Sequence, residues 1–281
     1  MTEDRLSLPT SVGQAIWGDN LYRGHAVLGE LAGNDGYWSA VSLALGGPRL
    51  GPDDAAALDD ITICALAADP RIWPLKAARV GSAYGNPVAG LCTGQLAVDQ
   101  ARIGPATVGG SAALLHELRR TTPPLGTQTI DGRLDAWISE GRRLPGLGVP
   151  FRPEDERLEA LRRCMRARGR LTRPHWILME AINRHTTSAH RLPANVALAI
   201  AAVALDIGFT VEQISALPPA FLLPGFLANA FEGAQQRPAV LQRLPDAAVE
   251  YVGHPPRRSP RALEQDGPAE DGRPASPDRE R

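Results

Sequence analysis

The sequence has few of the residues that mark secreted, disulfide-stabilised or nucleic-acid-binding proteins. It holds only 3 cysteines in 281 residues, Cys64, Cys92 and Cys164, and no CxxC pair. An odd number of widely spaced cysteines is typical of reduced thiols, so we expect a cytoplasmic protein without disulfides. Lys76 is the only lysine, and a net charge of −1 gives no electrostatic reason to expect nucleic acid or an anionic membrane as a partner.

Targeting signals and uninterrupted apolar runs are also absent. Residues 1–10 have no basic patch followed by an apolar run, so we expect no signal peptide. The apolar stretch Ile207–Phe231 is interrupted by Glu212 and by several prolines and a glycine, which favours a buried helical hairpin over a membrane span. No His/Cys/Asp/Glu spacing indicates a metal site, and we expect no permanently bound cofactor.

Strand signals are scarce, and helical signals replace them. Aromatic residues make up only 5% of the chain, and Val/Ile/Thr runs are few, which disfavours a large sheet. The run Pro52-Asp53-Asp54 is typical of a helix start, Gly208 is typical of a helix end, and a further helix is expected at about 131–141. Apolar residues recur at helical spacing in seven segments, which predict an all-α protein: Trp38–Leu45, Ala55–Ala67, Pro87–Val98, Ala112–Arg120, Asp155–Arg168, Pro174–His185 and Asn195–Ile207.

The composition changes at Pro255. The last 27 residues hold six prolines, six arginines, six acidic residues and one leucine. Such a segment cannot bury enough apolar surface to offset the entropy lost on ordering. We predict that residues 255–281 form a disordered tail.

Short motifs along the chain resemble those of the citrate synthase family, including its citryl-CoA lyase branch. The resemblance runs from about residue 11 to 254, and the order and spacing of the motifs carry it. The motifs are Leu21–His25, Asp69–Arg79, Val108–Ser111, Gly146–Arg157, Pro193–Ala197, Leu222–Glu232 and Arg243–Gly253.

Within these motifs, the groups that would exchange protons are missing. The family places histidines where this chain has Pro70, Val108 and Val149, and its base, an aspartate, where this chain has Ala197. None of these four side chains exchanges a proton or donates a hydrogen bond. In the Leu222–Glu232 motif, Leu222 replaces an arginine and Asn229 a histidine.

Other residues of the family pattern are kept, and the resemblance implies that they bind substrate. They are Arg79, Gly109, Gly110, Gly148, Arg157 and Asn195. Guanidinium groups suit carboxylates and phosphates. However, Arg157 could equally pair with neighbouring acidic residues, and the two adjacent glycines could serve only close helix packing.

The resemblance also implies an architecture. It predicts a citrate synthase-like helical fold with a large domain from residues 1–114 and 216–254 and a small inserted domain at 115–215. Family members are homodimers, and the segments Pro87–Val98 and Ala220–Phe231 are expected to contribute to the interface.

Two functions follow from the resemblance. The first is a noncatalytic or strongly altered homologue that keeps a cleft for acyl-CoA or a small carboxylate, or that pairs with an active relative. The alternative is an enzyme, either a citrate synthase-type acyltransferase that converts acyl groups into alkyl on transfer, or a citryl-CoA lyase. It would use replacement groups such as His190 or Asp155. A purely structural dimer without a ligand is a third possibility.

Overall fold

The computed structural model describes residues 7–99, 104–121, 130–149, 152–236, 243–254 and 259. The chain divides into two units, Met1–Leu241 and Gln242–Arg281. The predicted disordered tail lies outside the described residues except for Ser259. The division of residues 1–254 into a large and a small domain stays a prediction.

The first unit begins with a small antiparallel sheet. Strands β1 (Gly13–Ile16), β2 (Asp19–Tyr22) and β3 (His25–Ala26) follow one another in the sheet as they do in the chain. Gly13 lies opposite Tyr22 in the first pair, and Tyr22 lies opposite His25 in the second. A single π-helical turn, η1 (Val27–Leu31), follows the sheet.

Helices make up most of the remaining described chain, so the all-α prediction is confirmed. The second unit contributes one short 3-10 turn, η3 (Asp246–Ala248). The first unit contains α1 (Tyr37–Ala44), α2 (Pro52–Ala65), α3 (Trp73–Ser82), α4 (Pro87–Asp99), α5 (Pro105–Thr121), α6 (Ile130–Ser139), α7 (Glu156–Ala167), α8 (Pro174–His190), α9 (Val196–Ile207), α10 (Val211–Ala216) and α11 (Pro218–Gln235).

The helix boundaries follow from local chemistry. Proline is the first residue of α2, where its fixed φ suits a helix and its missing N–H has no partner to lose. Asp54 in the same first turn accepts a hydrogen bond from the Gly51 N–H at 3.3 Å. At the other end of a helix, Gly208 terminates α9 with a φ of 112°, a conformation that side chains disfavour.

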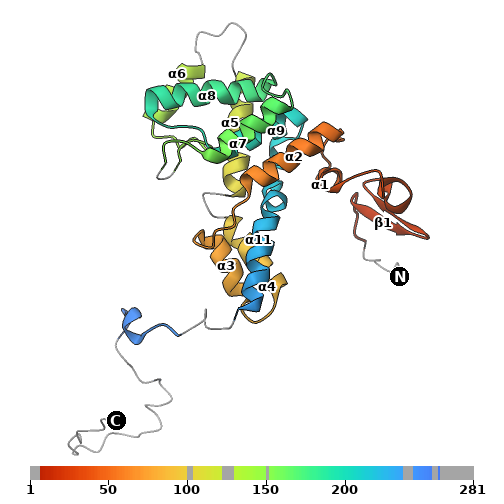
Figure 1. The fold of residues 1–281 in the computed structure, drawn as a ribbon, viewed down its shortest axis with the longest axis vertical. Helices are drawn as coiled ribbons and strands as arrows, with labels where there is room; N and C mark the ends of the chain where they lie inside the picture. The colour runs from red at the N-terminus through yellow and green to blue at the C-terminus, as the bar shows by residue number, and fades with distance from the viewer. Residues whose placement is uncertain are drawn as a thin grey trace, which may run out of the picture. The chain divides into compact units, whose positions relative to one another are not determined.

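Two hydrophobic cores organise the first unit. The larger core surrounds α9, whose residues 196–204 are all buried, and includes Leu58, Leu115 and Met179 from other helices. The smaller core consists of Leu75, Ala78, Val98 and Phe226. Figure 1 shows α11 (blue) beside α3 and α4 (orange), which pack together around this smaller core.

Helix α11 belongs to the apolar stretch that raised the question of a membrane span. Val211–Gln235 has the length and composition of such a span, with a mean hydropathy of 1.4, and 44% of its most apolar window is buried inside the protein. A side chain at Gly225 would overlap the backbone of Ala67, just after α2, and one at Gly233 would overlap the backbone of Arg79 in α3. Helix α11 is therefore packed in the protein interior along one face, and the absence of membrane partners stays a prediction.

Candidate functional site

A cavity of about 230 Å³ lies between the two cores. The larger core contributes residues of α2, α5 and α9, and the smaller core contributes residues of α3, α4 and α11. Arg157 is the one charged side chain among the described residues that line it. The complete lining is Ala65, Ala67, Ile72, Pro74, Leu75, Val98, Gly104, Val108, Arg157, Val196, Ala197, Ile200, Pro218, Phe221, Leu222 and Phe226.

The structure brings several positions of the sequence motifs to this cavity. Val108, Ala197 and Leu222 line it together with Arg157, although they come from four separate segments. Pro70 and Val149, two further positions at which the resemblance places a histidine, are outside the described lining. The described wall therefore contains no group that titrates near neutral pH, and one group that can hold an anion.

Asp155 holds Arg157 in place. The two side chains form a bidentate ion pair, with Nε to Oδ1 and Nη2 to Oδ2 both at 2.9 Å. Asp155 also caps α7, because its Oδ1 accepts the backbone N–H of Arg157 at 3.0 Å. The Arg157 side chain remains 45% exposed, so part of the guanidinium is open to a ligand.

The same carboxylate joins α7 to α9. Oδ2 of Asp155 accepts the backbone N–H of Val196, the first residue of α9, at 2.8 Å. Burial alone would raise the pKa of Asp155, but the hydrogen bonds from Arg157 and Val196 and the charge of Arg157 outweigh it and hold the pKa below its ordinary value. An ionised carboxylate with both oxygens occupied is a poor general base, which weighs against Asp155 as a replacement catalytic group.

Asn195 and Gly148 shape the backbone at the start of α9. The Asn195 side chain caps the helix by accepting the Ala197 N–H at 3.0 Å, and it donates to the Gly148 carbonyl at 3.1 Å. Gly148 has a φ of 85° and donates its N–H to the Pro193 carbonyl at 2.7 Å. Both residues thus support the wall formed by Val196 and Ala197, and neither lines the cavity itself.

Gly109 and Gly110 allow close packing of α5. A Cβ atom on Gly109 would overlap the Ser215 hydroxyl and lie 3.0 Å from its Cβ, and one on Gly110 would lie 2.8 Å from Pro145 Cγ. The helix-packing alternative from the sequence thus has a direct structural basis. Ligand contact by these glycines stays a prediction.

Arg79 lies on α3 and pairs across to α11. Its guanidinium nitrogens lie 3.0 and 2.7 Å from the two carboxylate oxygens of Glu232. It also donates to Asn229 Oδ1 at 3.4 Å, while Asn229 donates to the Ala68 carbonyl at 2.9 Å. Arg79 is not among the described residues of the cavity wall. Its contacts tie α11 to α3, and the Asn229 amide ties α11 to the segment before α3.

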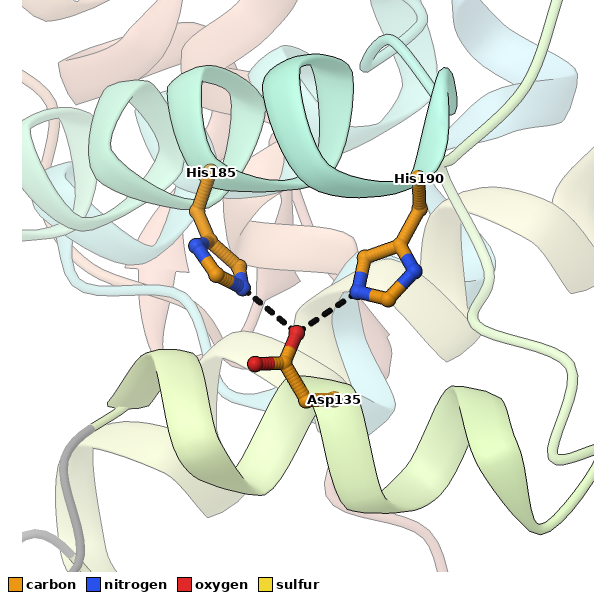
Figure 2. A group of neighbouring side chains, drawn as sticks. All are labelled: Asp135, His185 and His190. Atoms are coloured by element: carbon orange, nitrogen blue, oxygen red, sulfur yellow. Dashed lines mark hydrogen bonds and ion pairs between the residues drawn. The ribbon is translucent and has the colours of Figure 1, made fainter.

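His190 lies in a separate cluster with Asp135 and His185 (Figure 2). The Nε2 atoms of the two histidines lie 2.6 and 2.7 Å from the same oxygen, Oδ1 of Asp135. None of the three lines the cavity. The linear sequence does not reveal this group, because Asp135 is on α6 and the histidines are on α8.

Two further histidines, His116 and His175, have ordinary structural surroundings. His116 is exposed on α5. At the start of α8, the backbone N–H and Nδ1 of His175 lie 2.9 and 2.8 Å from Oδ1 of Asp206. Neither lies in the described cavity wall.

Solved structures with the same fold come from enzymes of citrate and CoA chemistry. Citryl-CoA lyase from Hydrogenobacter thermophilus superposes with a TM-score of 0.77 at 22% identity, over 92% of this chain and 99% of that chain. ATP citrate lyase from Methanosaeta concilii, in complex with (3S)-citryl-CoA, gives a TM-score of 0.65 at 17% identity, over 92% of this chain and 43% of that one. Citrate synthase from Thermoplasma acidophilum gives 0.53 at 18% identity, over 82% and 60% of the two chains.

Sequence comparisons add nothing to these likenesses. No protein-family model matches the chain, and no curated protein does. At 22% identity or less, the structural likeness establishes the fold but not the activity. The chain has the helical fold shared by citryl-CoA lyase and citrate synthase.

Proposed function

We propose that this protein is a noncatalytic or strongly altered member of the citrate synthase fold that binds an acyl-CoA or a small carboxylate in the cavity between its two cores. The observation that carries the proposal is the cavity wall, in which Arg157 is the single charged group among apolar described residues. A guanidinium supplies a partner for a carboxylate or phosphate, and the apolar wall supplies a surface for an acyl chain.

The size of the cavity restricts the ligand. Its volume of about 230 Å³ is below the roughly 300–1,000 Å³ of pockets that enclose drug-sized molecules. We infer that it encloses the acyl or carboxylate part of a ligand, while the rest of a CoA molecule lies outside. The ligands in the neighbouring structures, (3S)-citryl-CoA in one and citrate with coenzyme A in another, support this class of compound.

The composition of the cavity wall argues against carbon–carbon bond formation or cleavage of the kind that names such as citrate synthase and citryl-CoA lyase describe. Positioned acid–base groups contribute roughly 10²–10⁴-fold each to a rate. The described wall has apolar side chains at Val108 and Ala197, where the resemblance places such groups. A single arginine cannot transfer the protons that carbon–carbon bond formation or cleavage next to a thioester requires.

The alternative is catalysis with replacement residues, as a citryl-CoA lyase or a citrate synthase-type acyltransferase. The fold match to citryl-CoA lyase, over 99% of that chain, favours it. However, His190 is bonded to Asp135, Asp155 is bonded to Arg157, and neither lines the described cavity wall. We therefore rank binding without turnover first.

Calorimetry with CoA, acetyl-CoA, citrate and oxaloacetate tests ligand binding. We expect at least one of them to bind, and Arg157→Gln to weaken that binding about tenfold or more, since a hydrogen bond to a charged group contributes roughly 1.5–3 kcal/mol. Arg142→Gln is a matched control, because Arg142 is 42% exposed and also ion-paired, but lies outside the cavity wall. No heat from any of the four compounds would support a purely structural role.

A cavity-filling variant tests the location. Val108→Phe adds a ring next to the void, so it should abolish binding without loss of the folded state. Binding that survives this change would place the ligand elsewhere.

Turnover is measured in two assays: release of the free CoA thiol from acetyl-CoA in the presence of oxaloacetate, and loss of citryl-CoA. We expect no turnover in either assay. Turnover that is lost in His190→Ala or Asp155→Ala would instead establish the enzyme alternative.

The proposal also covers the oligomeric state, the cellular compartment and the partner of the protein. We propose a cytoplasmic homodimer whose ligand-bound form regulates or accompanies an active relative. Co-purification of such a relative with the wild-type protein but not with the Val108→Phe variant would support this role.

A further inference from the structure

We infer that Asp135, His185 and His190 form a binding site for a divalent transition-metal ion. The three side chains come from two helices and converge on one point, as Figure 2 shows. One ligand atom from each lies within 4.8 Å of the others. Two imidazole nitrogens and one carboxylate oxygen are ligands that zinc and related ions accept.

The distances suit a small rearrangement around a metal. Both Nε2 atoms lie within 2.7 Å of Oδ1 of Asp135. Zinc with bonds of about 2.0–2.1 Å in a tetrahedral geometry needs ligand atoms about 3.3 Å apart. Widening the two Nε2–Oδ1 distances from 2.6 and 2.7 Å to about 3.3 Å takes side-chain shifts of under about 1 Å. The Asp135 carboxylate is free to move by this amount, because it is half-exposed and bonds only to these two histidines among the described residues.

A second carboxylate lies beside one of the histidines. Nδ1 of His185 lies 3.6 Å from Oδ2 of Asp131, one turn before Asp135 on α6. At 3.6 Å this contact is longer than a hydrogen bond, but it leaves Asp131 beside the nitrogen that would carry the proton once a metal ion occupies Nε2. In the metal-free protein, a proton between Nε2 and Oδ1 of Asp135 accounts for their 2.7 Å separation, and a metal ion would take the place of that proton. A carboxylate behind a ligating histidine is the usual outer partner in metal sites.

Partial exposure leaves room for further ligands. The side chains of His185 and His190 are 17% and 24% exposed, and that of Asp135 is 48% exposed. Water can therefore complete the coordination, and the ion can enter from solvent. The site is separate from the cavity wall, so this inference does not depend on the proposed ligand. A bound ion would fix α6 to α8.

Zinc is the probe for the test. Full-length protein is freed of metal with a chelator and titrated with Zn²⁺ by calorimetry. We expect one ion per chain, at least tenfold weaker binding in His185→Gln and in His190→Gln, and a smaller loss in Asp131→Asn. Glutamine can still donate a hydrogen bond to Asp135 but is a poor zinc ligand. His116→Gln, which changes an exposed histidine on α5, should bind as the wild type does.

A second measurement does not depend on the folding of any variant. X-ray absorption at the zinc edge of the wild-type protein should show two imidazole ligands together with oxygen ligands. Failure of Zn²⁺ to bind, binding unchanged by both glutamine substitutions, or a spectrum without two imidazoles would each overturn the inference. In that case a proton would hold the cluster together.

Discussion

Oδ2 of Asp155 accepts the backbone N–H of Val196 at 2.8 Å and thereby connects the start of α7 to the start of α9. The same side chain is 1% exposed and forms the ion pair with Arg157. Asp155 thus both holds Arg157, the one charged group among the described residues of the cavity wall, and anchors the start of α9 in that wall. We therefore expect the proposed ligand site and the stability of the fold to depend on the same carboxylate.

Asp155→Asn should destabilise the protein by about 2–4 kcal/mol, because an amide NH₂ would face N–H donors in a buried site. The pKa of Asp155 is lowered in the folded state, so its contribution is present above the unfolded value near 3.9 and is lost as the pH falls below about 4. Urea unfolding from pH 7 to pH 3 should therefore show a steeper loss in the wild type than in the variant.

Glu154→Gln is the control for this prediction, since Glu154 is an exposed neighbour. It should leave the free energy of unfolding and its pH dependence nearly unchanged. Equal acid sensitivity in the wild type and Asp155→Asn would contradict the assigned role.

Gly109→Ala should destabilise the protein despite the better helix propensity of alanine. The new methyl group would overlap the Ser215 hydroxyl, and overpacking typically costs about 1–3 kcal/mol against a propensity gain of roughly 1 kcal/mol. Ser215→Gly removes the two closest atoms. In a double-mutant cycle measured by urea unfolding, the two changes should couple by about 1 kcal/mol or more, and strict additivity would count against this packing.

Cys64 should resist alkylation in the folded protein. Burial, reinforced by the neighbouring Cys164 thiol, raises the pKa of Cys64 to about 11. Since the thiolate is the reactive form, its fraction at pH 8 is about 100-fold smaller than that of an ordinary thiol with a pKa near 8.5–9.

Timed iodoacetamide labelling followed by mass spectrometry checks this difference. Cys92 is exposed and serves as the internal reference. The two rates should converge in urea. Equal rates without denaturant would show that the Cys64 thiol is open to solvent.

The predicted homodimer has a testable surface on α4 and α11. Val88 and Leu96 on α4 and Leu227 and Phe231 on α11 are all at least half-exposed, although burial of such side chains yields about 1.5–3 kcal/mol each. A double variant, Leu96→Asp with Phe231→Glu, should convert a dimer to a monomer in light scattering after size exclusion. Ile177→Asp changes an equally exposed apolar residue on α8 and should leave the dimer intact. A monomeric wild type would refute the prediction.

Helices with clear apolar periodicity and clear terminal signals were located well from the sequence, and helices without them were not. Periodic apolar residues and terminal signals located α2 and α9 closely, including the start at Pro52 and the stop at Gly208. Helical spacing did not predict α3 (Trp73–Ser82), whose buried face consists of Pro74, Leu75, Ala78 and Ser82. Small residues and a proline give a weak periodic signal, and α3 is stabilised by its packing against α4 and α11.

The candidate site was predicted in part. The apolar replacements at Val108 and Ala197 could be inferred from motif order, and both line the cavity with Arg157. The sequence could not reveal that the pairing of Arg79 is with Glu232, because that contact joins residues 153 positions apart. Nor could it reveal that Asp155 accepts backbone N–H groups at the starts of two helices, α7 and α9. An aspartate near an arginine is also common on solvated helices, so the sequence pattern does not single out this role.

The amino-acid sequence alone is enough to assign the helical class and to predict apolar residues at the positions of the family's acid–base groups, because both depend on residue identity and on spacing within a few turns. The tertiary fold alone brings Val108, Arg157, Ala197 and Leu222, from four distant segments, to one cavity and places Asp135 beside His185 and His190. Contacts between residues so far apart in the sequence depend on how whole helices pack. That packing is set by the summed burial of many side chains rather than by any local pattern.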